Sequence, residues 1–275
     1  MLKEPFHVAV PTGFFEDESL NTEATIEHIR NLYKQGVKSV LVSGTTGEQH
    51  SLTLGEKLHL LDRLVAEDEL LDNMEVLFGV SSIRQLEAEE LAKSIGQTKV
   101  SGILLGYPPY VLPSQEEALA YTTKIIDLSG KPTILYNNPA RTGFDLSFHS
   151  VIQLSKRNLV IGLKEAGSKE RVPMLKNEVD RRDFYFYAGG EVGLEEKAAK
   201  DFNRLSSIAG NVSPVEIKQY SHKVFTGQTI TTQERTNIEK IIKQIYQGSP
   251  LVNLKKCINQ KGISIGSCRS PIGNS

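Results

Sequence analysis

Eight short apolar runs, separated by stretches of helical pattern, constrain the fold of this chain more than any other feature. They begin at intervals of roughly 23 to 37 residues, which leaves room for one helix between each run and the next. Near-continuous apolar strands are typical of a parallel sheet that is buried on both faces. The runs occupy residues 7–10, 39–42, 76–80, 102–105, 133–136, 160–163, 184–187 and 207–209. Eight such units favour an α/β fold of the (β/α)8 TIM-barrel type over an open doubly wound sheet.

The intervening helices have recognisable ends. Asn21 is a predicted N-cap, and Gly36 follows the end of the same helix. Thr53 and Ser114 each precede a glutamate by three residues, which is the spacing of a capping box. These signals predict helices after the first, second and fourth apolar runs.

The apolar runs stop before Pro214, and only helical pattern follows. This change predicts two domains: a catalytic barrel over residues 1–213 and a helical extension over residues 214–275 that packs on it. We expect the helices of the extension at residues 214–225, 231–246 and 251–259. The final segment, residues 262–271, lacks helical periodicity, so the chain is expected to end without a further helix.

Composition excludes several classes of function. The chain has 275 residues and a net charge of -1, with no Lys/Arg cluster, so a nucleic-acid partner is not expected. No apolar stretch is long enough to span a bilayer, and the N-terminus has no apolar signal region. Cys257 and Cys268 do not form a zinc-site or disulfide-framework pattern, and we interpret them as free thiols. The expected location is the reducing cytoplasm.

Reactive side chains follow the predicted strands. Lys164 ends the sixth run, and an amine at a buried strand end loses its water, which favours the neutral nucleophile that forms imines with carbonyls. Tyr136 and Arg141 follow the fifth run and offer a proton carrier and a carboxylate clamp. A solvated lysine at the rim of a sheet is the ordinary interpretation of Lys164 by itself. Two reactive neighbours on the adjacent strand end weaken that interpretation.

Three motifs, in order along the chain, resemble the dihydrodipicolinate synthase and N-acetylneuraminate lyase family of pyruvate-dependent class I aldolases. They are Gly44-Thr45-Thr46-Gly47-Glu48, Tyr136-Asn137-x-Pro139-x-Arg141-Thr142-Gly143 and Gly162-x-Lys164-Glu165. The resemblance extends from about residue 8 to at least residue 214. It implies a TIM barrel, a lysine Schiff base with pyruvate, and neither a metal nor an organic cofactor.

The resemblance also implies roles for individual residues. Lys164 would form the imine, and Tyr136 would transfer protons during its formation. The Thr45 hydroxyl would link Tyr136 to Tyr110, which in relatives reaches into a neighbouring subunit's site. A homo-oligomer, either a dimer or a tetramer, is therefore expected.

The remaining candidates are substrate-binding residues. By resemblance, Thr46 would hold the pyruvate carboxylate together with Thr45, and Arg141 would hold a carboxylate on the second substrate. Gly189 follows the seventh run. Ser206 stands where relatives typically have an aliphatic residue near pyruvate.

The closest branch of the family implies condensation of pyruvate with aspartate semialdehyde, the 4-hydroxy-tetrahydrodipicolinate synthase reaction of lysine and diaminopimelate biosynthesis. Departures such as Ser206 and His50 leave another pyruvate-imine aldolase or dehydratase open, for example a sugar-acid aldolase or an N-acetylneuraminate lyase-like enzyme. Two further alternatives stay open: a keto-acid-binding barrel without catalysis, and a pyridoxal-phosphate enzyme that also uses a lysine imine.

Overall fold

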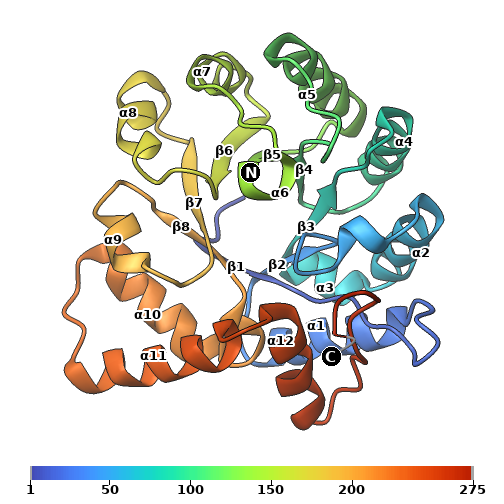
Figure 1. Cartoon of the computed structure of the whole chain (residues 1–275), viewed down its shortest axis with the longest axis vertical. Coiled ribbons are helices and arrows are strands. Elements are labelled where there is room, and N and C mark those ends of the chain that lie inside the picture. Colours follow the sequence, from blue (N-terminus) through green and yellow to red (C-terminus); the bar gives the residue numbers. More distant parts are fainter. Residues whose placement is uncertain (1, 274–275) are drawn as a thin grey trace.

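The computed structural model describes residues 2–273 and contains one closed barrel of eight parallel strands (Figure 1). Each strand pairs with the next in sequence, and β8 closes the barrel on β1. The strands are β1 (Phe6–Ala9), β2 (Ser39–Val42), β3 (Glu75–Val80), β4 (Gly102–Gly106), β5 (Thr133–Asn137), β6 (Val160–Glu165), β7 (Tyr185–Gly189) and β8 (Arg204–Ser207). The predicted TIM barrel is confirmed.

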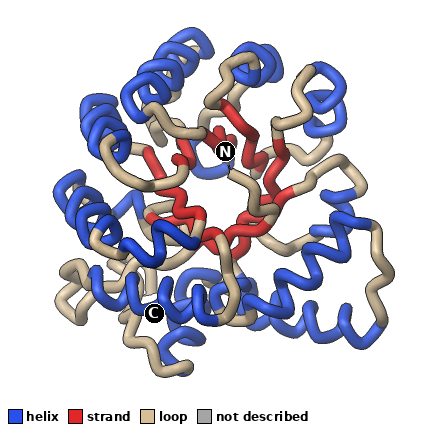
Figure 2. Tube along the Cα trace, turned by 180° about the vertical axis from the view of Figure 1, so that it is seen from behind, coloured by secondary structure: helices blue, strands red, loops and turns tan. Residues whose placement is uncertain are grey.

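Helices surround the strands on the outside of the barrel (Figure 2). They are α1 (Thr22–Lys34), α2 (Leu54–Val65), α3 (Asp68–Asn73), α4 (Gln85–Gly96), α5 (Gln115–Ser129), α7 (Phe148–Ser155), α8 (Arg171–Glu178) and α9 (Leu194–Ala198). Three short helices lie in the connections after β2, β5 and β8: the 3-10 helix η1 (Gln49–Ser51), α6 (Pro139–Thr142), which Figure 1 shows in the middle of the ring of strands, and the 3-10 helix η2 (Ala209–Asn211). The predicted caps are confirmed: Asn21 accepts from the Ala24 N–H, and Thr53 and Ser114 each form a capping box.

The predicted boundary of the eighth strand is wrong. Sequence pattern placed it at residues 207–209, whereas β8 spans Arg204–Ser207 and residues 209–211 form η2. The first residue of β8, Arg204, is charged, so the hydropathy pattern does not indicate a strand there, although the Arg204 side chain is buried. Its guanidinium lies 3.9 Å from the centre of the Tyr185 ring, so the ring shields the charged group within the barrel.

The strands separate two apolar cores. The inner core fills the barrel and takes one residue from each of β1 to β7, together with Leu2 near the N-terminus: Leu2, Ala9, Leu41, Leu77, Leu104, Ile134, Ile161 and Tyr187. The outer core lies between strands and helices and includes Leu135 and Leu163. The interior of the barrel is therefore a packed core and not an open channel.

A shift in register gives β6 its functional orientation. Thr133 pairs with Val160, but the next residue, Ile134, pairs with Gly162, so β6 carries one extra residue. Beyond this bulge Tyr136 pairs with Lys164. Without the extra residue Tyr136 would pair with position 163, and position 164 would point outward. The bulge therefore turns the Lys164 side chain into the barrel.

The segment after β8 contains α10 (Pro214–Thr226), α11 (Thr232–Tyr246) and α12 (Pro250–Gln260), close to the predicted positions. Residues 261–273 form turns and extended segments without a helix, as expected. This tail contacts the β1–α1 connection, where the Phe14 N–H donates to the Ile265 carbonyl oxygen at 3.2 Å. Cys257 and Cys268 are both buried and free. Within residues 2–273, no helix has the length and the apolar character needed to cross a membrane.

Candidate active site

Lys164 is a buried amine near the carboxyl end of β6. Its side chain donates a hydrogen bond to the Ser206 hydroxyl at 2.9 Å, and its Nζ lies 4.7 Å from the centre of the Tyr136 ring. Only 8% of the residue is exposed. Burial lowers the pKa of Lys164, and Arg141 adds to that effect, while Tyr136 and Glu191 oppose it. More of the amine is therefore neutral and nucleophilic at a given pH than for a solvated lysine.

The Tyr136 hydroxyl is the centre of a small hydrogen-bond network. It accepts from the Asn138 amide at 2.7 Å, and the Thr45 side chain helps to lower its pKa. Burial raises the pKa of Tyr136, but its neighbours outweigh burial. The Lys164 amine, the Asn138 hydrogen bond, the Thr45 side chain and Arg141 together bring the pKa below its ordinary value. Tyr136 is thus better suited to proton transfer near neutral pH than a free tyrosine.

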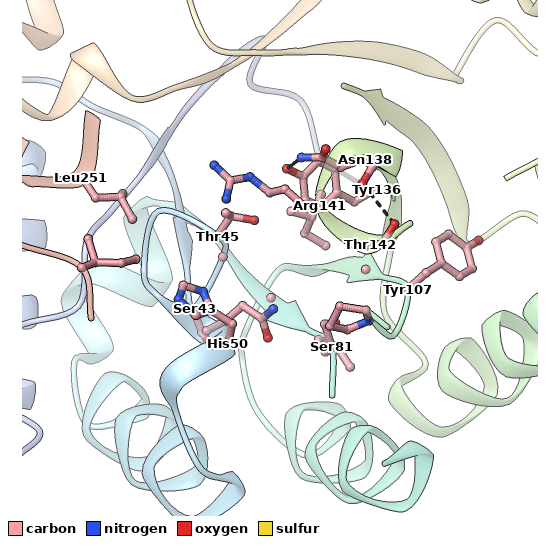
Figure 3. Close-up of a pocket in the computed structure, with 18 residues that line it drawn as sticks. Ser43, Thr45, His50, Ser81, Tyr107, Tyr136, Asn138, Arg141, Thr142 and Leu251 are labelled. Carbon is pink, nitrogen blue, oxygen red and sulfur yellow. Dashed lines mark hydrogen bonds between the residues drawn. The ribbon is translucent and has the colours of Figure 1, made fainter. Parts of the chain in front are cut away.

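A cavity of about 220 Å³ opens beside Tyr136 at the carboxyl ends of β2 to β5 (Figure 3). The 18 described residues that line it include Arg141 and His50 and no aspartate or glutamate. Figure 3 shows Arg141 and Thr45 close together on this cavity. Lys164 is not among the lining residues, but the Tyr136 ring that contacts its amine is. The electrostatic character of this space favours an anionic ligand.

The predicted site residues occupy different positions around this centre. Thr45 and Arg141 line the cavity, whereas Thr46 is buried within the β2–α2 connection. Gly189 is so close to Lys164 that an added Cβ would lie 3.3 Å from its Cε. A side chain there would crowd the end of the Lys164 side chain.

Tyr110 lies apart from the other candidates in this single chain. Its side chain is 89% exposed, and its backbone is in the left-handed region with a φ of 75°. Tyr107, from the same loop, lines the cavity, but its hydroxyl is hydrogen-bonded to Thr122 at 3.1 Å. Burial raises the pKa of Tyr107 beyond the physiological range. Tyr107 is therefore less suited to proton transfer near neutral pH than a free tyrosine.

Two buried residues near Lys164 were missed by sequence reasoning. His7 is on β1 in register with Ser206, and its ring centre lies 5.5 Å from that of Tyr187. Burial, with Lys164 and Arg204, lowers the pKa of His7 to about 3, so this imidazole is neutral. Only a residue-by-residue assignment of inward positions on the first strand could have found His7.

Glu191 is the second missed residue. Its carboxylate accepts from the Tyr246 hydroxyl at 2.6 Å and from the N–H groups of Ile208 and Ala209 at 3.0 and 3.1 Å. These donors stabilise a buried anion, and its charge raises the pKa of Lys164. Its position four residues after the seventh apolar run was a signal, but its hydrogen-bond partner Tyr246 comes from α11 and was not predictable from spacing.

Comparisons with known proteins agree with this architecture. A family model described as the dihydrodipicolinate synthetase family matches residues 4–275. The chain is 28% identical to the 4-hydroxy-tetrahydrodipicolinate synthase of Methanothermobacter thermautotrophicus over 272 residues, which cover 97% of this chain and 95% of that relative. It is 29% identical to the enzyme of the same name from Staphylococcus carnosus over 233 residues, which cover 83% and 77% of the two chains.

Solved structures share the fold. Dihydrodipicolinate synthase from Aquifex aeolicus superimposes with a TM-score of 0.86 at 22% identity, covering 98% of this chain and 92% of that chain. YagE from E. coli K12, a prophage protein of the same family solved in complex with pyruvate, has a TM-score of 0.85 at 24% identity, with 99% and 93% covered. The match of the family model over nearly the whole chain establishes that this protein belongs to the dihydrodipicolinate synthetase family of class I aldolases, which are lyases.

Proposed function

We propose that this protein forms a Schiff base between Lys164 and pyruvate and condenses it with aspartate semialdehyde, as a 4-hydroxy-tetrahydrodipicolinate synthase of lysine and diaminopimelate biosynthesis. The observation that carries the proposal is the buried Lys164 amine in contact with the Tyr136 ring. The cavity beside that ring has Arg141 and no acidic side chain, which supports a second substrate that bears a carboxylate.

The first half of the reaction makes an enamine. The neutral Lys164 Nζ attacks the ketone carbon of pyruvate, and the carbinolamine loses water with a proton delivered by Tyr136. Tyr136 then accepts a proton from the methyl group of the imine. Thr45 and Thr46 hold the pyruvate carboxylate, and Thr45 connects Tyr136 to the rest of the proton relay. Ser206, which accepts a hydrogen bond from Lys164, and Gly189, which leaves space beside it, complete the pyruvate pocket.

The second half consumes the enamine. Its carbon attacks the aldehyde carbon of aspartate semialdehyde, whose carboxylate is bound by the Arg141 guanidinium. The amino group of the same substrate then attacks the imine carbon, closes the ring and expels the Lys164 amine. Every bond formed or broken is accounted for by the two substrates, Lys164 and the relay.

A different pyruvate-imine aldolase or dehydratase is the second candidate. YagE, which was solved with pyruvate, belongs to the same family without being named as the synthase. His50 and Gln49 line the cavity and offer hydrogen bonds to a hydroxylated sugar acid.

The decisive experiment traps the imine. Incubation with pyruvate and borohydride should inactivate the protein and add the reduced adduct to Lys164, and Lys164→Ala should abolish both effects. A steady-state panel of pyruvate with aspartate semialdehyde and with sugar-acid aldehydes then assigns the second substrate. Labelling confined to another lysine contradicts the mechanism, whereas trapping without turnover of aspartate semialdehyde supports the second candidate.

Arg141→Ala is the matched test of the second substrate. Trapping of pyruvate should be nearly unchanged, while condensation with aspartate semialdehyde should weaken by roughly ten- to a hundredfold, the effect of losing one charge-assisted contact. An equal loss in both measurements would show that Arg141 does not select the second substrate.

We also propose that the protein acts as a homo-oligomer in which Tyr110 completes the relay of a neighbouring copy. Tyr110, Val111 and Leu112 are exposed by 89%, 50% and 59%, which leaves an apolar loop beside the active-site end of the barrel. Measurement of the mass in solution tests this, and a catalytically active monomer would contradict it.

A further inference from the structure

The turn that carries Thr45 and Thr46 is held between two residues with unusual backbone geometry. Ser43 and Glu48, at either end of the turn, both have a φ of 53°. Residues other than glycine occupy this left-handed region only where the surrounding contacts hold them there. A further hydrogen bond, from the Thr12 hydroxyl to the Gly47 carbonyl oxygen at 2.6 Å, ties the turn to the β1–α1 connection.

Both carboxylate oxygens of Glu48 are held by the C-terminal part of the chain. Oε1 lies 2.7 Å from Lys255 Nζ, and the two side chains are 1% and 2% exposed. Oε2 accepts from the Arg269 N–H at 3.0 Å. The carboxylate therefore connects the turn after β2 to α12 and to the tail.

The tail is itself anchored at several points. The Arg269 guanidinium donates to the carbonyl oxygens of Ser51 and Glu18 at 2.8 and 2.9 Å, and it also pairs with Glu56. Arg269 and Lys255 both lie over the Phe14 ring, each 4.3 Å from its centre. The tail thus spans the connections that follow β1 and β2.

We propose that Glu48 and Lys255, with the backbone of the tail at Arg269, are positioning residues that keep the Thr45–Thr46 turn in the shape that binds the pyruvate carboxylate. This inference rests on the proposed function. A buried ion pair contributes little net stability, because desolvation of both charges offsets their attraction. Its contribution is to fix one geometry, and here the geometry is that of a turn whose hydroxyl and N–H groups must converge on a small anion.

The test compares a ketone that has a carboxylate with one that has none. Borohydride trapping at Lys164 is measured against pyruvate and against acetone in Lys255→Met. The pyruvate concentration for half-maximal trapping should rise by about ten- to a hundredfold, the effect expected for a charge-assisted contact. Trapping of acetone should remain at the wild-type level. Lys256→Met is the matched control, since the exposed neighbour on the same helix should leave both ketones unaffected.

Two results would overturn the inference. Lys255→Met could leave pyruvate saturation unchanged, or it could weaken trapping of pyruvate and acetone equally, as a general structural defect would. Should Lys255→Met fail to fold, Arg269→Ala provides the same comparison, because it loosens the tail without leaving a buried charge unpaired. It should show the same pyruvate-specific loss, and an unchanged ratio of the two ketones would refute the proposal. Failure of the wild-type protein to form any pyruvate imine would instead count against the proposed function.

Discussion

Lys164 meets two conditions that a nucleophilic amine requires: burial that favours its neutral form, and nearby hydroxyl groups of the kind that can transfer protons. The first follows from its place within the barrel, and the second from Tyr136, Asn138 and Thr45. Neither condition requires Lys164 to form a buried ion pair with an acidic side chain. The reactivity proposed for Lys164 is thus a property of its surroundings.

Replacing Tyr136 with phenylalanine should separate proton transfer from binding. Tyr136→Phe keeps the ring that contacts Lys164 but removes the hydroxyl, so turnover should fall by about a hundred- to ten-thousandfold. Pyruvate saturation should change far less, because the carboxylate contacts remain. Steady-state kinetics with both substrates measure the two effects. A nearly unchanged turnover would make Tyr136 structural and would place the proton carrier elsewhere.

At the scale of single elements, the bulge in β6 decides which way Lys164 points. Gly162 lies directly after the extra residue, and an added Cβ would lie 2.4 Å from the Tyr185 carbonyl oxygen. The bulge therefore depends on a close approach of β6 to β7 that only glycine permits. Packing between two strands, rather than local propensity, sets the orientation of the reactive amine.

Gly162→Ala should consequently impair both stability and function. The clash is with backbone, so we expect a loss of about 1–3 kcal/mol in the free energy of unfolding, as for other overpacked sites. Imine formation with pyruvate should fall as well, because Lys164 is displaced. Chemical denaturation and borohydride trapping measure the two effects. Gly55→Ala in the first turn of α2 is the control: its Cβ would have space, and stability should be equal or slightly higher. Equal behaviour of the two variants would contradict this account.

At the scale of the whole molecule, buried histidines link stability to pH. Burial lowers the pKa of His7 to about 3 and that of His28 to about 4. The ordinary histidine pKa is near 6.5, so between that value and the lowered ones the unfolded chain binds protons that the folded protein excludes. Stability is therefore fully present above about pH 6.5 and decreases as the pH falls toward 3.

Urea denaturation across pH should show this dependence. The unfolding free energy attributable to these groups should be level above about pH 7 and should fall steadily below 6.5. His7→Gln removes one of the two titrations and should reduce the slope between pH 6.5 and 4. The exposed His59 is the matched control, and His59→Gln should change the slope little. An unaltered slope in His7→Gln would show that His7 is not buried in the neutral form.

Much of the fold could be predicted because local sequence patterns determine where its strands and helices begin. The spacing of the apolar runs indicated all eight strands, and caps such as Asn21 and Thr53 marked helix starts correctly. The eighth strand was misplaced because Arg204 is buried through a contact with Tyr185 on another strand, which no local pattern reports. The motifs at the strand ends likewise indicated Lys164 and Tyr136, whose roles remain predictions.

The sequence by itself determined the succession of strands and helices and the family to which its motifs belong, since periodicity, capping and short motifs act over a few residues. Only the tertiary structure decided how the site is assembled. The extra residue in β6 turns Lys164 inward, and His7 and Glu191 surround it from distant parts of the chain. The C-terminal tail reaches the turn after β2 through Glu48. These features arise from contacts between residues far apart in sequence, where burial and geometry depend on the closed barrel and not on neighbouring residues.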